Sequence, residues 1–189
     1  MVLLYWKHYP VAKDYMTKFT IKDFRKRFPT DDACLEDLMS KKYGMTGKCP
    51  ATYCNKQTKF HKVKGRKCYE CQWCGYQVYP TAGTIFHKSA TPLTDWFYVM
   101  YLMTATRSGV SAKEIQRQLG VTYKCAWRMC HQIRKAMDEK PKLKNEVEAD
   151  ETYVGGVRKG KRGRGASGKT PVFGLVQRKG KISATVVGN

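Results

Sequence analysis

The chain has 189 residues, enough for one or two ordinary domains, and its formal net charge of +21 comes from 36 Lys and Arg against 15 Asp and Glu. Self-repulsion of that size destabilises a compact state, so a polyanionic partner is expected, and the interleaved aromatic residues favour nucleic acid over a disordered basic tail. No stretch is apolar for long enough to span a bilayer, and the N-terminus has no signal-peptide pattern. We therefore expect no membrane partner and a cytoplasmic location in or near the nucleoid.

The chain opens with a segment of helical character. Residues 17–44 read as helical, and Thr20 or Asp23 could cap the start. The run Asp31–Lys42 begins with two acids and ends with two lysines, as the helix dipole prefers. Residues 49–80 then look like short strands and turns.

Five of the eight cysteines lie between positions 49 and 74, and such clustering in a reducing compartment favours metal ligands over disulfides. Cys49 and Cys54 form one pair, and Cys71 and Cys74 form a second, more compact pair. Two thiolate pairs joined by a hairpin give the tetrahedral sulfur cage that Zn²⁺ prefers, with no open position for chemistry. Cys68 is interpreted as a bystander, and the alternative is a set of free, buried cysteines.

Three helical segments follow, at 93–107, 111–119 and 122–137. Ser111 and Glu114 have the spacing of a capping box, and Gly120 ends the second segment. The last two segments predict a helix-turn-helix, with Ile115, Leu119, Val121, Ala126 and Ile133 as core and with Met129, Cys130 and Met137 at apolar helical positions. In such a unit the second helix enters the major groove, and its leading residues are Tyr123, Lys124, Trp127 and Arg128. The alternative is a helical hairpin with a solvated basic face.

An acidic strand, Glu146–Val154, interrupts this basic chain. Strand alternation puts Glu146, Glu148 and Asp150 on one face and Glu151 on the other. A carboxylate on a central strand can bind Mg²⁺ through oxygen, and paired ions can support phosphodiester cleavage. No Asp or Glu follows Glu151, so this strand cannot complete such a site by itself.

A basic, glycine-rich loop follows the acidic strand, at 158–169, and precedes a hairpin of strands at 172–177 and 181–187. We expect the loop either to lie along phosphates or to be solvated and disordered. Its candidate DNA contacts are Arg158, Lys159, Lys161, Arg162 and Arg164.

These motifs resemble bacterial insertion-sequence transposases of the zinc-ribbon DDE type, the ISXO2-like group. The resemblance runs from about Phe24 to Val187. The matching features are Phe24-Arg-Lys-Arg-Phe28-Pro, Cys34-Leu, Cys49-Pro, Cys71-Gln-Trp-Cys74-Gly, Gly83-Thr-Ile-Phe86, Leu93-Thr-Asp-Trp96-Phe97, Gly109-Val-Ser-Ala-Lys-Glu114-Ile, Leu119-Gly120, Ala126-Trp127, Val147-Glu-Ala-Asp150-Glu151-Thr-Tyr153-Val-Gly155-Gly156 and Pro171-Val-Phe-Gly. The last two blocks are the most specific.

The resemblance implies an α+β chain whose parts are an N-terminal helical segment (1–47), a zinc ribbon (48–80), a helix-turn-helix (91–140) and the first strands of a ribonuclease H-like domain (145–189). It implies that Asp150 is the first catalytic metal ligand, that Zn²⁺ is structural and Mg²⁺ catalytic, and that the protein cuts and joins DNA at the element's terminal repeats as a homo-oligomer. Members of the group carry two further catalytic residues on a longer chain. We therefore expect this one to be truncated and not to cleave DNA alone. A second departure from the pattern is the wide Cys49–Cys54 spacing.

Two other hypotheses about function are compatible with the sequence. A zinc-ribbon, helix-turn-helix DNA-binding regulator without chemistry is compatible with these residues. An RNA-binding ribbon protein is allowed by the aromatic content, although the helix-turn-helix pattern does not favour it.

Overall fold

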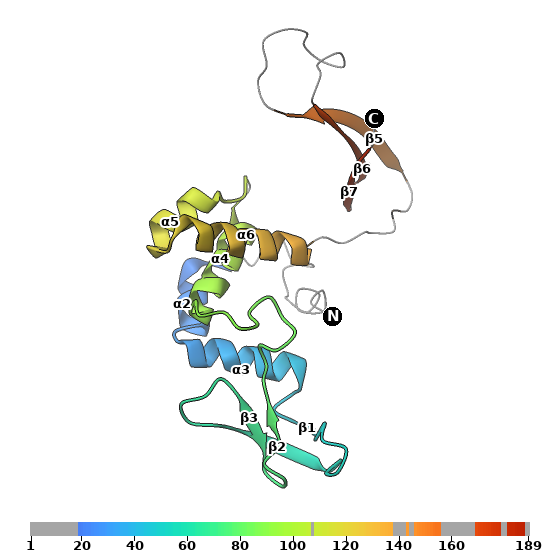
Figure 1. Ribbon diagram of the computed structural model, residues 1–189. Coiled ribbons are helices and arrows are strands. Elements are labelled where there is room, and N and C mark those ends of the chain that lie inside the picture. The colour runs from blue at the N-terminus through green and yellow to red at the C-terminus, as the bar shows by residue number, and fades with distance from the viewer. Residues whose placement is uncertain are drawn as a thin grey trace. The chain divides into compact units, whose positions relative to one another are not determined.

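The structure is a computed structural model, and it describes residues 19–106, 108–137, 143, 146–155, 169–178 and 181–187. The chain divides into two compact units, residues 1–137 and 138–189 (Figure 1). Helices and two antiparallel sheets make up the described parts, as the α+β prediction required. None of the described helices has the length and apolar character needed to cross a bilayer.

The predicted helical region at 17–44 is two helices within its described part, α2 (Ile21–Arg27) and α3 (Asp31–Lys42). Thr20 caps α2 in a reciprocal capping box with Asp23, so both suggested capping residues take part. The break falls at Phe28, because a residue that precedes a proline is driven out of the helical conformation. The predicted bounds of the second helix are confirmed.

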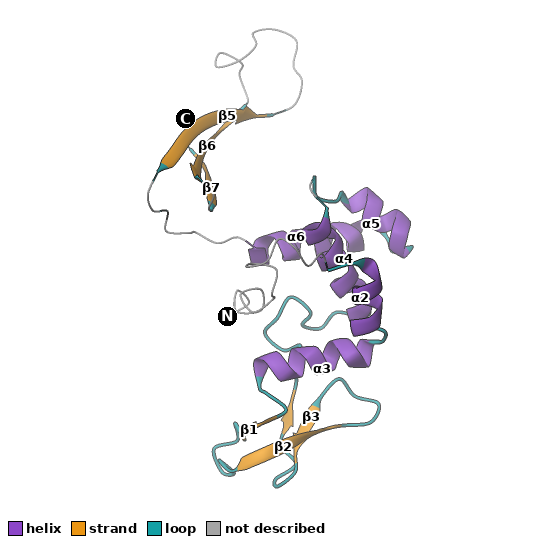
Figure 2. Ribbon diagram, turned by 180° about the vertical axis from the view of Figure 1, so that it is seen from behind, coloured by secondary structure: helices purple, strands orange, loops and turns teal. Residues whose placement is uncertain are grey.

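The first sheet consists of β1 (Thr46–Lys48), β2 (Gln57–Lys62), β3 (Tyr69–Cys71) and β4 (Gln77–Val78), in that order and antiparallel throughout (Figure 2). Its inner face buries Thr58 and Phe60 of β2, and its outer face exposes Gln57, Lys59 and His61. The alternation follows from the two-residue period of a strand.

Three further helices complete the first unit: α4 (Leu93–Ala105), α5 (Ala112–Leu119) and α6 (Tyr123–Met137). The first of these ends at Ala105, two residues earlier than predicted, because Thr106 is extended. Aromatic contacts join the helices and loops of the core, including Phe28 with Phe97 at 4.8 Å and Phe86 with Trp96 at 5.6 Å between ring centroids.

The second unit contains a three-stranded antiparallel sheet, with β6 (Thr170–Gln177) between β5 (Val147–Val154) and β7 (Ile182–Val186). The predicted acidic strand and the predicted hairpin are both present. However, the acidic strand flanks the described sheet and is not its middle strand, which differs from the central position that we expected for Asp150.

Candidate metal centre and nucleic-acid interface

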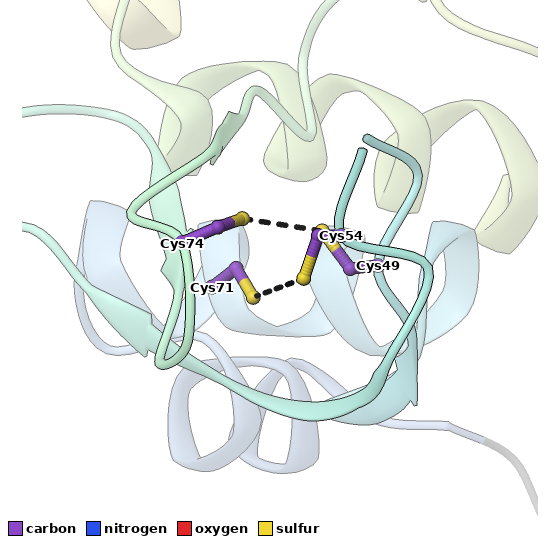
Figure 3. A group of neighbouring side chains, drawn as sticks. All are labelled: Cys49, Cys54, Cys71 and Cys74. Carbon is purple, nitrogen blue, oxygen red and sulfur yellow. Dashed lines mark hydrogen bonds between the residues drawn. The ribbon is translucent and has the colours of Figure 1, made fainter. Parts of the chain in front are cut away.

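The structure brings together the four cysteines that the sequence paired. The Sγ atoms of Cys49, Cys54, Cys71 and Cys74 all lie within 4.8 Å of one another and could hold a metal ion (Figure 3). Two of the separations are 3.7 Å, from Cys49 to Cys74, and 4.0 Å, from Cys54 to Cys71. A tetrahedral zinc site with Zn–S bonds of about 2.3 Å has sulfur separations of about 3.8 Å. The donor set and its spacing therefore fit Zn²⁺.

Two short turns place these sulfurs. In the first loop the N–H groups of Cys54 and Asn55 both donate to the carbonyl oxygen of Ala51, at 3.0 Å, and Asn55 adopts a left-handed φ of 47°. This turn absorbs the extra residues of the wide cysteine pair. In the second loop the N–H of Gly75 donates to the Cys71 carbonyl at 3.0 Å, with a φ of 69° that suits glycine.

The four thiols have unequal acidities. Burial raises the pKa of Cys49 to about 12, and hydrogen bonds with the neighbouring cysteines add to the shift. Burial also acts against ionisation of Cys71, but its hydrogen bonds with the Thr58 side chain and with the backbone of Cys74 and Trp73 outweigh burial and lower its pKa to about 6. Several thiolates can coexist in so small a volume only with a cation among them, as metal binding supplies.

Cys68 lies outside this group and is completely buried. It directly precedes Tyr69, the first residue of β3, and its carbonyl oxygen accepts a hydrogen bond of 3.1 Å from the N–H of Val63.

The α5–α6 pair has the local structure that a helix-turn-helix needs. The Ser111 side chain accepts a hydrogen bond from the N–H of Glu114, and Gly120 ends α5 with a φ of 66°. The capping box is only half formed, because the Glu114 carboxylate binds Arg117 and Gln118, and these contacts lower its pKa to about 2.

Most of the predicted helix-turn-helix core is present. Ile115, Ala126 and Ile133 are buried, together with Met129 and Cys130, and Leu119 and Val121 pack against them. Met137, predicted at an apolar helical position but not as part of this core, is exposed in the last turn of α6.

The predicted DNA-contact residues at the start of α6 differ in their surroundings. Tyr123, Lys124 and Trp127 are exposed, and the indole of Trp127 stacks on His131 at 5.0 Å. Arg128 is exposed as well, but its guanidinium contacts the protein: one of its nitrogens lies 3.3 Å from the Ser89 hydroxyl and its Cζ lies 5.5 Å from the Trp96 ring centroid.

Asp150 is exposed on β5, and its Oδ1 accepts a hydrogen bond of 2.8 Å from the N–H of Glu151. Its partner on β6 is Gly174, which has no side chain, and the next partner across the sheet is Ala184. This face of the sheet therefore leaves the carboxylate uncovered. The neighbouring acids differ, because Arg178 pairs with both Glu146 and Glu148, at 3.1 and 2.9 Å.

Sequence reasoning missed Arg178 as the partner of these acids. The strand register would have pointed to it, since Gln177 lies opposite Val147. The candidate contacts Arg158, Lys159, Lys161, Arg162 and Arg164 lie outside the residues that the structure describes.

Together these features define a strongly basic protein with a four-cysteine cluster that could hold a metal ion and a helical hairpin in one unit, and a sheet with an uncovered carboxylate in the other. Residues 142–189 match the family described as the ISXO2-like transposase domain. The chain is also 30% identical, over 146 residues, to an "Uncharacterized protein in transposable element ISH50" from Halobacterium salinarum. The two matches confirm the resemblance to ISXO2-like insertion-sequence transposases.

The alignment with the Halobacterium salinarum protein covers 69% of this chain and 49% of that protein, so the chain spans about half the length of this relative. No solved structure matches the chain.

Proposed function

We propose that this chain acts in an insertion-sequence transposase that binds duplex DNA at the ends of its element and uses Asp150 in metal-dependent phosphodiester transfer. The observation that carries the proposal is the position of Asp150, an uncovered carboxylate on β5, inside the segment that matches a transposase domain. Such a protein would work as a homo-oligomer on chromosomal DNA, in the nucleoid.

Zn²⁺ would be held by Cys49, Cys54, Cys71 and Cys74 in a zinc ribbon formed by the first sheet. Four thiolate ligands leave no coordination position for water or substrate, so the role of this metal is structural. Binding of this kind contributes on the order of 10 kcal/mol to the folding of a small unit.

Helix α6 would enter the major groove with its first turns. Tyr123, Lys124 and Trp127 are exposed there, and Lys113 extends the basic surface, with its Nζ 5.0 Å from the Tyr123 ring centroid. Lysine would contact phosphate or a guanine edge, and the aromatic rings would pack on sugar or a thymine methyl group. Arg128 would have to leave Ser89 and Trp96 to join them. The cations at 158–164 would extend the contact along phosphates.

Mg²⁺ is the oxygen-preferring ion that Asp150 would hold, and its chemistry in such a site is to polarise phosphate and activate a water or hydroxyl. Glu146 and Glu148 share the Arg178 guanidinium, and no ion pair of Asp150 is found among the described residues, which makes Asp150 the better ligand on this face. Residues 152–189 contain no Asp or Glu, so the other metal ligands would come from elsewhere. We therefore expect the 189-residue chain to bind DNA without cutting it.

Fluorescence anisotropy with labelled duplexes tests DNA recognition by α6. One duplex carries the inverted repeat that flanks the gene, and a second has the same composition in scrambled order. We expect wild type to bind the repeat more tightly than the scrambled duplex. If Lys124 contacts phosphate, Lys124→Ala should reduce the slope of log binding constant against log salt concentration by about one unit. Lys64→Ala, in the exposed loop between β2 and β3, is the control. Equal binding of both duplexes by wild type would contradict end recognition.

A non-catalytic DNA-binding regulator is the second candidate, and the observation that favours it is that the four-cysteine cluster and the α5–α6 hairpin lie in a compact unit that does not contain Asp150. Isothermal titration with Mg²⁺ separates the two candidates. Because the other metal ligands would come from elsewhere, the titration uses a chain extended through the rest of its reading frame. The transposase proposal then expects binding that Asp150→Asn abolishes and that Glu148→Gln leaves in place. Absence of any Asp150-dependent binding would favour the regulator.

A further inference from the structure

The two loops that carry the cysteines each present an aromatic side chain to solvent. Tyr53 directly precedes Cys54 and Trp73 directly precedes Cys74, and these rings are 73% and 59% exposed. The four sulfurs lie within 4.8 Å of one another, so both rings are carried at the same end of the first sheet. Two large aromatic side chains left in water beside one rigid centre indicate a contact surface.

The indole of Trp73 is held in place although it is exposed. Its Nε1 donates a hydrogen bond of 2.9 Å to the carbonyl oxygen of Gln57, and its backbone N–H lies 3.4 Å from the Cys71 sulfur. The Lys56 ammonium lies 5.6 Å from the ring centroid, in cation–π range. A ring whose orientation is already fixed loses little conformational entropy when a ligand stacks on it.

The surroundings of Trp73 are basic. Residues 46–78 contain seven Lys and Arg and one acid, Glu70, a net charge of 7 − 1 = +6. Lys48 lies opposite Gln57 in the sheet register, and the carbonyl oxygen of Lys59 accepts from the N–H of Gln72, beside Trp73. Lys56 therefore lies at the indole, and Lys48 and Lys59 occupy exposed positions of the adjoining strands.

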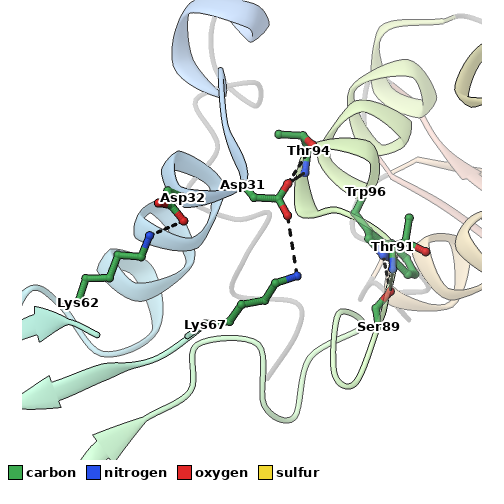
Figure 4. A network of polar contacts seen from close by, with 8 residues as sticks. All are labelled: Asp31, Asp32, Lys62, Lys67, Ser89, Thr91, Thr94 and Trp96. Carbon is green, nitrogen blue, oxygen red and sulfur yellow. Dashed lines mark hydrogen bonds and ion pairs between the residues drawn. The ribbon is translucent and has the colours of Figure 1, made fainter. Parts of the chain in front are cut away.

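Two other lysines near the sheet form ion pairs with acidic residues of α3. Lys62 and Lys67 form ion pairs with Asp32 and Asp31 of α3, at the far end of β2 and in the loop that follows it (Figure 4). The ion pairs found among the described residues do not include Lys48, Lys56 or Lys59. Positive charge is thus available for a ligand at the end that carries the aromatic rings.

We propose that this aromatic end of the first sheet, formed by Tyr53, Trp73, Lys48, Lys56 and Lys59, binds single-stranded DNA. Unpaired bases would stack on the two rings while the lysines contact phosphates, the combination that non-specific single-strand binding uses. Duplex DNA is a poorer fit, because its base faces are already stacked on one another. A protein partner is also a poorer fit, because lysine is depleted in the core of protein interfaces.

This proposal goes beyond duplex recognition by α6 and does not depend on it. The test uses the metal-loaded 189-residue chain, a fluorescein-labelled oligo-dT of about 15 nucleotides, and a duplex of random sequence, with anisotropy as the readout for both. We expect Trp73→Ala to weaken oligo-dT binding roughly tenfold. Trp73→Phe keeps a ring and should retain most of the affinity. Neither variant should change duplex binding by more than about twofold.

Trp127→Ala is the matched control, since Trp127 is also an exposed tryptophan, 52% accessible, but lies on α6. It should leave oligo-dT affinity unchanged. Metal content, measured for every variant by elemental analysis, shows that the cysteine cluster is intact. Wild-type oligo-dT affinity in a metal-loaded Trp73→Ala protein would overturn the proposal, as would an equal loss in Trp127→Ala. If Trp127→Ala changed neither oligo-dT binding nor duplex binding, the proposed role of α6 in duplex recognition would be wrong, and the single-strand proposal would still stand.

Discussion

Replacing Asp31 by alanine should destabilise the first unit more than replacement of a partly exposed residue usually does. One carboxylate oxygen of Asp31 accepts hydrogen bonds from the N–H and the hydroxyl of Thr94, at 3.0 and 2.9 Å (Figure 4). The other lies 3.8 Å from the Lys67 ammonium. Helix α4 begins after Pro92, which provides no side-chain cap, so Asp31 of α3 caps α4 from another helix.

The size of the effect follows from these contacts. A helix cap contributes about 1 kcal/mol, and a hydrogen bond to a charged group contributes about 1.5–3 kcal/mol. The lower end applies here, because the Asp31 side chain is 34% exposed and the two bonds share one acceptor. The exposed pair with Lys67 adds a few tenths of a kcal/mol at most. We therefore expect Asp31→Ala to lower the free energy of unfolding by about 2 kcal/mol.

The measurement is urea unfolding of the metal-loaded protein at pH 7, followed by circular dichroism of the helices. Asp32→Ala is the control, because Asp32 is the next residue, its side chain is 74% exposed, and its ion pair within the described part of the chain is with Lys62. The control should cost less than about 0.5 kcal/mol. Equal losses in the two variants would refute the idea that Asp31 caps α4.

The effect of Asp31 should also depend on pH. Burial alone would raise the pKa of Asp31, but hydrogen bonds from Thr94 and from the N–H of Leu93 outweigh it and lower the pKa. A carboxyl with a depressed folded pKa stabilises the fold fully above its unfolded pKa, and that contribution is lost as the pH falls through the folded value. The difference between wild type and Asp31→Ala should therefore shrink below about pH 4.

Three further outcomes are expected. Cys54→Ser should lose its metal under elemental analysis, whereas Cys68→Ser should retain it, although burial of Cys68 makes that change costly in thermal stability. Gly120→Ala should lower the free energy of unfolding in urea by about 1 kcal/mol, because alanine is strained at the left-handed φ of 66° even though no atom lies within 4 Å of the added carbon. Ser111→Ala removes the cap of α5 and should cost about 1 kcal/mol in the same assay. A Ser111→Ala chain as stable as wild type would mean that the hydrogen bond from the Glu114 N–H to Ser111 does not stabilise α5.

Elements whose determinants are local in sequence could be predicted. The bounds of α3 follow from its terminal charges, and the end of α5 follows from Gly120. The four sulfurs could be paired because the spacing of metal-binding cysteines is itself a local property. The break at Phe28 was also visible, in the proline that follows it, but the helical periodicity on both sides obscured it.

Contacts between distant segments could not be predicted in the same way. The partner of Arg128 is Ser89, 39 positions away, and the partner of Asp31 is Thr94, 63 positions away. When only α6 is considered, the guanidinium of Arg128 has no partner within the helix, and the pattern therefore predicts a DNA contact. The packing of α4 against α6 brings Trp96 under that cation, and no periodicity within one helix contains this information.

The same long-range contacts connect the parts of the first unit. Asp31 joins α3 to the start of α4 and reaches Lys67 in the loop between β2 and β3, while Arg128 joins α6 to the loop before α4. The cysteine-bearing sheet and the α5–α6 hairpin are therefore connected through α4. If α6 binds duplex DNA and the sheet binds an unpaired strand, DNA that contains both a duplex and a single-stranded part should bind more tightly than either part alone. Weakening the Asp31 contact should reduce this gain in affinity. That gain depends on holding the two sites at a fixed distance, which is the condition for a high effective concentration of the second site.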